Sequence, residues 1–234
     1  MAKERERHHH EDLLTKITKK IEYFIVKHLK IIIISVSSVI IVLAMYFSAD
    51  YFFSRKEEKA QGAFDKVYIV YIDLLNKEDM SEEELNKKLI DLNEDFLIVL
   101  NEYPKSKAAA KSAFYIGNTL YNNEQYEEAA IYYEQGAFET RKYYISFLCL
   151  KNLASCYEQL DEYEKAIETY NKIEELFIDE FILPTILFNR GQLYEKLNKF
   201  EKANDEYARI ISNYPWSSWK EFAEKRQLLI KNFM

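Results

Sequence analysis

The sequence predicts an all-α protein in which short antiparallel helix pairs stack into a solenoid behind one long apolar helix. Three observations predict this fold. The 234 residues include only four glycines and three prolines, too few for the many turns of a β-rich fold. A run of nineteen uncharged residues lies near the N-terminus, and one pattern of small and aromatic residues recurs at a spacing of 37.

The uncharged run covers residues 31–49, between Lys30 and Asp50. A helix needs about 20 apolar residues to cross the hydrocarbon core of a membrane. Aromatic residues that could form an interfacial belt lie at its far end: Tyr46, Tyr51, Phe52 and Phe53. We therefore expect a transmembrane helix over residues 31–53.

The span reads as a retained signal-anchor, because both the apolar run and the tail before it are longer than in a usual signal peptide. A cleaved signal peptide, with a weak cleavage site at Ser48-Ala49, is the open alternative. Five lysines precede the run and three basic residues follow it, which favours a cytoplasmic N-terminus. The rest of the chain would then be extracytoplasmic, on the periplasmic side of an inner membrane. The reversed orientation stays open.

Residues 1–30 are expected to form a cytoplasmic amphipathic tail. Apolar residues recur there at helical spacing, with lysines between them: Leu13, Leu14, Ile17, Ile21, Phe24 and Ile25. The tail either lies on the membrane surface or is an ordinary cytosolic helix. The run of His8, His9 and His10 is interpreted as incidental composition, with weak metal binding as the alternative.

Three stretches align at an offset of 37 residues: 113–136, 150–173 and 187–210. Each places a small residue where two helices would approach closely, and a second small residue twelve positions later on the partner helix. The small residues are Gly117, Ala154 and Gly191, followed by Ala129, Ala166 and Ala203. Aromatic residues begin each second helix and cap the packing one turn after the alanine: Tyr126, Tyr163 and Phe200, then Tyr133, Tyr170 and Tyr207. A helix pair of this kind buries its apolar stripe only when neighbouring pairs stack on it.

These positions resemble the tetratricopeptide repeat (TPR), and the resemblance covers about residues 105–215. The usual early tryptophan is absent, since Ala113, Leu150 and Leu187 stand there. The unit is also slightly longer than the usual 34 residues. The resemblance implies a solenoid of about four antiparallel helix pairs, with three repeats in residues 105–216.

The flanking segments complete the solenoid. Residues 54–104 are expected to hold a stalk helix, about 55–76, and a degenerate first repeat whose second helix is capped by Ser81. Residues 217–234 are expected to form a capping helix that begins at Ser217 or Ser218 and covers the last repeat.

Catalytic chemistry is not expected. All four histidines lie at or before residue 28, and four scattered glycines cannot build a phosphate-binding loop. We therefore expect no catalytic residue, no metal site, no cofactor and no enzymatic activity. Cys149 and Cys156 are seven residues apart on one predicted helix, too far for a disulfide, so they are expected to be buried free thiols.

Charge excludes one class of partner. Residues 1–49 have a net charge of +3 and the remainder a net charge of −10. Nucleic acid binding requires clustered basic charge, so no nucleic acid partner is expected.

The resemblance implies a partner-binding groove on the first helices of the repeats. Carried over position by position, the groove residues are Phe114, Asn118, Tyr121, Asn122, Lys151, Ser155, Glu158, Gln159, Phe188, Gln192, Glu195 and Lys196. Their mixture of aromatic and amide side chains suits an apolar or amphipathic protein segment.

The overall plan of tail, span and repeats resembles the ancillary subunits of the bacterial Sec translocon and the TPR proteins of the bacterial cell envelope. This resemblance implies a membrane-anchored scaffold or chaperone-like adaptor that binds envelope or secreted proteins. A structural subunit of a stable envelope complex, without client binding, is the alternative.

Overall fold

The structure is a computed structural model that describes residues 2–139, 144–177 and 181–233. It divides into two compact units, residues 1–55 and residues 56–234, which are described separately below. The side chains of His8, His9 and His10 lie outside the described part of the chain.

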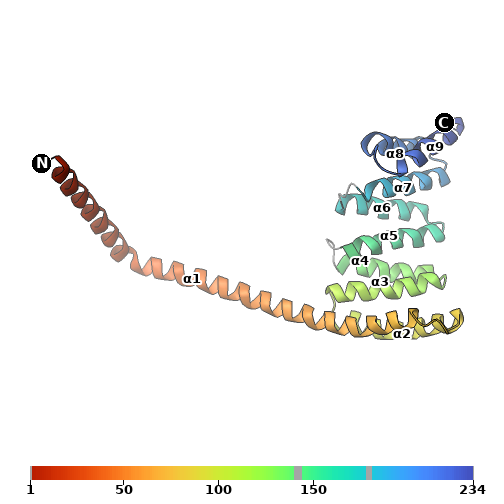
Figure 1. Cartoon of the computed structure of the whole chain (residues 1–234), viewed down its shortest axis with the longest axis horizontal. Coiled ribbons are helices and arrows are strands. Elements are labelled where there is room, and N and C mark those ends of the chain that lie inside the picture. The colour runs from red at the N-terminus through yellow and green to blue at the C-terminus, as the bar shows by residue number, and fades with distance from the viewer. Residues whose placement is uncertain (1, 140–143, 178–180, 234) are drawn as a thin grey trace. The chain divides into compact units, whose positions relative to one another are not determined.

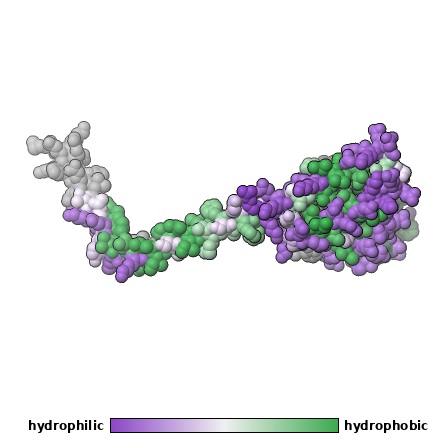
Figure 2. Space-filling view, turned by 90° about the horizontal axis from the view of Figure 1, so that it is seen from below, coloured by the Kyte–Doolittle hydropathy of each residue, from purple (hydrophilic) through white to green (hydrophobic). Residues whose placement is uncertain are grey.

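One helix, α1 (Ala2–Leu75), extends across the boundary between the two units. Its apolar stretch is long enough and apolar enough to cross a membrane, and none of it is buried within the structure. The described side chains of residues 31–49 are exposed, and Figure 2 shows hydrophobic residues along this part of the chain. Length and composition therefore permit a membrane span, which is weak evidence for one.

The second unit is an all-α solenoid, which confirms the predicted fold class. After the end of α1, antiparallel helices stack one layer on the next (Figure 1). They are α2 (Glu82–Glu102), α3 (Lys107–Asn122), α4 (Tyr126–Glu139), α5 (Tyr144–Gln159), α6 (Tyr163–Leu176), α7 (Leu183–Lys196), α8 (Phe200–Asn213) and α9 (Trp219–Ile230), followed by the short 3-10 helix η1 (Lys231–Phe233). The second helices α4, α6 and α8 begin at the three aromatic residues that the repeat pattern predicted.

The turn between the two helices of each repeat has one conformation, repeated three times. Glu124, Asp161 and Asn198 adopt left-handed backbone angles, with φ of 60°, 58° and 54°. In each turn the next amide donates to a carbonyl five residues back, for example Glu162 N to Tyr157 O at 2.8 Å. This bond closes the first helix by the 6→1 pattern usually associated with glycine. Here the repeats use non-glycine residues, so the turn chemistry was not visible as a glycine signal.

The small residues of the pattern lie directly under the tyrosines of the partner helix. A Cβ atom at Gly117 would lie 2.7 Å from Tyr133 Cε1, and one at Gly191 would lie 2.6 Å from Tyr207 Cε1. Real Cβ atoms do not approach other atoms so closely, so glycine is what lets the ring pack flat on the backbone. The paired alanines, Ala129, Ala166 and Ala203, are fully buried.

The core forms three clusters along the solenoid. The first joins the end of α1 to α2 and α3, where the rings of Phe64 and Phe96 have centroids 5.9 Å apart. The second cluster contains Cys149 and Cys156, which are buried free thiols as predicted. Burial raises the pKa of each thiol to about 12, which keeps them protonated and unreactive.

Helix α9 closes the C-terminal end of the solenoid. It buries Ala223 and Ile230 in the third cluster, together with residues of α7 and α8. Its first turn is held by Ser217, whose Oγ accepts a hydrogen bond from Trp219 N at 3.2 Å. This helix therefore covers the apolar face of the last repeat, while Leu228 and Leu229 remain exposed on its other side.

Candidate partner-binding face

The residues predicted for the groove form a row across the first helices α3, α5 and α7. Between α3 and α5, Asn152 Nδ2 donates to Asn118 Oδ1 at 3.1 Å, and the side chains of Tyr121 and Gln159 share a hydrogen bond. Between α5 and α7, the charge of Lys196 acts on Glu158. Several of the predicted side chains therefore lie next to one another across consecutive first helices. Asn152, the donor of the first of these bonds, was not among the predicted residues.

Three of the predicted groove residues are held by the tyrosines of the second helices. Tyr133 Oη donates to Asn118 Oδ1 at 2.7 Å. In the next two repeats, Tyr170 Oη donates to Glu158 at 2.9 Å and Tyr207 Oη donates to Glu195 at 2.5 Å. These contacts tie the two helices of each repeat together. Asn118, Glu158 and Glu195 therefore have a structural role within the repeat, which the sequence analysis missed.

Burial shifts the pKa values of the groups in these tyrosine–carboxylate contacts. Desolvation raises the pKa of Glu158, although the hydrogen bond from Tyr170 and the charge of Lys196 oppose the shift. Desolvation and the adjacent carboxylate also raise the pKa of Tyr170, so the phenol remains a donor. Glu195 has a second partner in Arg226 of α9, whose Nε lies 2.9 Å from its Oε1.

Phe188 was expected to line the groove, and the structure contradicts this. Only 7% of its surface is exposed. Its ring lies 4.7 Å from that of Trp219 and 5.6 Å from that of Tyr207. Helix α9 packs over the first helix of the last repeat and covers this position. Phe188 therefore belongs to the core.

The other eight predicted residues keep some accessible surface. Asn122, Lys151, Gln159, Gln192 and Lys196 are exposed, and Phe114, Tyr121 and Ser155 are half-buried. Lys196 Nζ lies 4.6 Å above the ring of Tyr163, which holds this lysine at the edge of the face. What is available is a face of amides and lysines with two partly covered aromatic rings. In the sections that follow, the candidate face means these eight residues.

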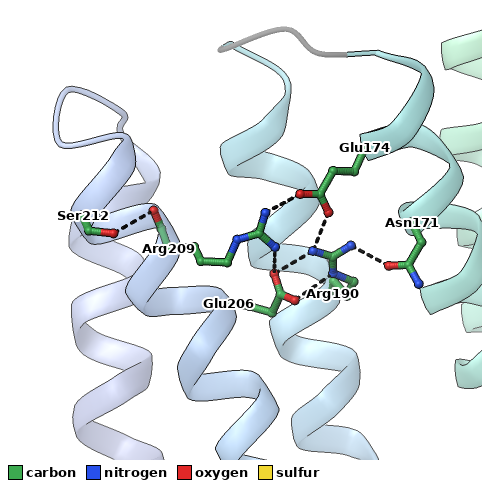
Figure 3. Close-up of polar contacts among 6 residues, drawn as sticks. All are labelled: Asn171, Glu174, Arg190, Glu206, Arg209 and Ser212. Atoms are coloured by element: carbon green, nitrogen blue, oxygen red, sulfur yellow. Dashed lines mark hydrogen bonds and ion pairs between the residues drawn. The ribbon is translucent and has the colours of Figure 1, made fainter.

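A buried ion-pair network lies behind this face, between α6, α7 and α8 (Figure 3). Arg190, 4% exposed, is bidentate to Glu206 at 3.0 and 2.8 Å and also pairs with Glu174 at 2.7 Å. Its Nη1 donates to Asn171 Oδ1 at 2.6 Å, and Arg209 pairs with both carboxylates. Burial alone would raise the pKa of Glu174, but Arg209 and Arg190 together lower it. The network pins three helices of two adjacent repeats in register.

Comparison with known proteins supports the repeats directly. Residues 152–177 and residues 186–216 each match a family model described as a tetratricopeptide repeat. No curated protein sequence matches the chain.

Solved structures share the fold at low sequence identity. A tetratricopeptide repeat protein from Parabacteroides merdae is 19% identical with a TM-score of 0.57, over 73% of this chain and 61% of that chain. The chain therefore spans less than two thirds of that protein. The nearly identical TPR-like repeats of a putative kinesin light chain from Podosopora anserina are 9% identical with a TM-score of 0.54, over 76% of this chain and 87% of that one.

At these identities the likeness establishes the fold, while the two matched segments establish the repeat type. The chain therefore carries tetratricopeptide repeats, on an all-helical solenoid of the kind that such repeats build.

Proposed function

We propose that this protein is a membrane-anchored adaptor that binds segments of other proteins on the first helices of its repeats. The observation that carries the proposal is the candidate face across α3, α5 and α7. A TPR fold suggests a protein–protein interaction scaffold, and here the second helices and the buried network hold the first helices rigidly for that purpose.

The chemistry of the candidate face indicates the kind of segment it would accept. Phe114 and Tyr121 offer partly covered rings, while Gln159 and Gln192 offer exposed amides and Lys151 a positive charge. An amphipathic segment would place apolar side chains against the rings and hydrogen-bond the amides. We propose no catalytic role for any of these residues.

The anchor would be residues 31–53, with the N-terminus in the cytoplasm and the repeats in an extracytoplasmic compartment such as a periplasm. This orientation rests on the excess of lysine before the span. The plan fits a bacterial envelope protein that attends envelope or secreted chains, and an association with the Sec translocon is one form of this role.

A second candidate is a structural subunit of a stable envelope complex. The observation in its favour is that Asn118, Glu158 and Glu195 are already satisfied within the fold, which leaves fewer groups for a changing set of clients. A fixed partner in constant ratio would support this candidate over the adaptor.

The test is in-cell photocrosslinking with the full chain. A photoreactive amino acid would replace exposed Gln192 on α7 and, as the matched control, exposed Asp205 on the second helix α8. The adaptor predicts protein crosslinks from position 192 that are absent from position 205, and that form to envelope or secreted chains.

Either of two outcomes would contradict the adaptor. Equal crosslinking from positions 192 and 205 would show that the candidate face is not the binding surface. Crosslinks only to cytoplasmic proteins would overturn the orientation in the membrane. A single partner in a fixed ratio would select the structural subunit instead.

A further inference from the structure

Exposed aromatic side chains gather on one edge of the solenoid. Among the described residues from 56 to 233, five aromatic side chains are exposed, and four lie near the starts of α5, α7 and α9: Tyr144, Phe181, Trp216 and Phe222. The fifth, Phe233, lies beyond the other end of α9. Figure 1 shows that α5, α7 and α9 begin on the same side of the stack. These four residues are called the aromatic edge below.

The members of the aromatic edge are highly exposed yet held in place. Phe181 is 81% exposed, Tyr144 67% and Trp216 52%. The ring of Phe181 lies 5.3 Å from that of Trp216, and Phe222 lies 5.8 Å from Trp219, which packs on the core. Large exposed rings of this kind mark an interaction surface, because water contact with them is unfavourable.

The turns within the repeats, at the opposite edge of the solenoid, are polar. Glu124, Asp161 and Asn198 are exposed there with left-handed backbone angles. Exposed aromatic side chains therefore accompany the helix starts of α5, α7 and α9, and among the described residues Phe233 is the one exposed aromatic at the other edge.

The chain enters the solenoid at the aromatic edge. Lys107 N, in the first turn of α3, donates to Glu57 Oε1 at 2.9 Å, and Lys111 Nζ donates to Gln61 Oε1 at 3.0 Å. The last part of α1 is therefore in register with α3, so residue 56 lies level with the start of α3, on the same side of the stack as the starts of α5, α7 and α9. Only six residues lie between Ala49, the end of the apolar run, and residue 56. They reach about 10 Å as helix and at most about 25 Å when extended.

We propose that the aromatic edge docks on the lipid surface of the membrane that holds the anchor. This inference rests on the membrane span of the proposed function. Tyr144, Phe181 and Trp216 would enter the boundary between headgroups and acyl chains, where tryptophan and tyrosine are enriched. Lipid is the occupant because the short tether limits the distance between residue 56 and the end of the apolar run to at most about 25 Å. The exposed rings also lie at the starts of α5, α7 and α9, where the aromatic edge is on the same side as the entry of the chain.

Docking in this way would set the orientation of the candidate face. The first helices would rise from the membrane with their starts at the lipid surface. The candidate face on α3, α5 and α7 would then lie at a fixed distance from the bilayer. It would face parallel to the membrane surface, where it is accessible to partners that lie along the membrane.

The test uses the fluorescence of Trp216 in the full chain, reconstituted in vesicles of phosphatidylcholine brominated near the headgroup end of its acyl chains. The chain has two tryptophans, so Trp219→Phe leaves Trp216 alone. A control chain carries Trp216→Phe, Trp219→Phe and Phe233→Trp, which moves the only tryptophan to the far end of α9. We expect quenching at Trp216 about twofold or more above that at position 233.

The outcomes separate the docking from the anchor. A chain that stays with the vesicles after an alkaline carbonate wash, but shows equal quenching at both positions, overturns the docking and leaves the anchor intact. A blue-shifted Trp216 without quenching means that protein covers the edge, and also overturns it. Release of the chain by the wash overturns the anchor and the docking together.

Discussion

Arg190→Ala is expected to lower the free energy of unfolding of the solenoid by about 3–5 kcal/mol. The guanidinium on α7 is buried and contacts Glu174 and Asn171 of α6 and Glu206 of α8. Removing it leaves the buried carboxylate of Glu206 and the half-buried carboxylate of Glu174 with Arg209 as their cationic partner, and weakening the pairing of a buried charge is costly. Chemical denaturation monitored by circular dichroism measures the change.

Lys165→Ala is the matched control for Arg190. Lys165 pairs with Glu162 at 2.8 Å, but both side chains are exposed, so we expect little change in stability. A similar small effect for both variants would show that the buried network does not hold the repeats together.

Acid titration gives a second measure of the same network. The folded-state pKa of Glu174 is lowered, so its ion pairs stabilise the fold above the ordinary pKa of 4.5. That stability is lost as the pH falls through the lowered folded-state pKa. The difference between wild type and Arg190→Ala should therefore shrink on acidification.

Tyr170→Ala is expected to lower the free energy of unfolding by about 3–5 kcal/mol, as replacing other buried aromatic residues with alanine does. The ring is 1% exposed in the second core cluster, and its hydroxyl joins Glu158 to Asn189. The variant creates a cavity and removes the link between α5, α6 and α7. Thermal and chemical melts of the same preparation should agree on the loss.

Two variants separate the contributions of Tyr170. Tyr170→Phe keeps the ring and removes only the hydroxyl, with an expected cost of about 1 kcal/mol. Tyr163→Ala removes a half-buried ring at the start of α6 and should cost less than Tyr170→Ala. If Tyr163→Ala were the more damaging of the two, the repeat alignment that places Tyr170 at the centre of the packing would be wrong.

The fold could be predicted because the repeat pattern records packing within each pair. Small residues at Gly117 and Gly191 are needed under the rings of Tyr133 and Tyr207, and this requirement is visible as a spacing. The turns could be placed but not explained. Glu124, Asp161 and Asn198 occupy left-handed positions that glycine usually marks.

The candidate site was harder to predict, because its details depend on contacts between repeats and at the end of the solenoid. Phe188 occupies a groove position in the pattern, yet α9 buries it, and an end effect leaves no trace in an internal repeat. Arg190 looks like a surface residue of an amphipathic helix. Its partners Glu174 and Glu206 lie sixteen residues before and after it, and only the packing of three helices brings them together.

The central claim is that the first helices bind a partner protein, and retention of that partner by purified variants tests it most directly. The full chain would be purified in detergent as wild type, as Gln159→Arg with Gln192→Arg, and as Asp205→Arg. The partner identified by crosslinking would then be quantified in each preparation. All three substituted side chains are exposed, so folding should be preserved, and melting curves would verify this. The account predicts that the double variant loses about tenfold or more of the bound partner, while Asp205→Arg retains it. Full retention by the double variant, or equal loss by both variants, would contradict the claim that the first helices form the binding face.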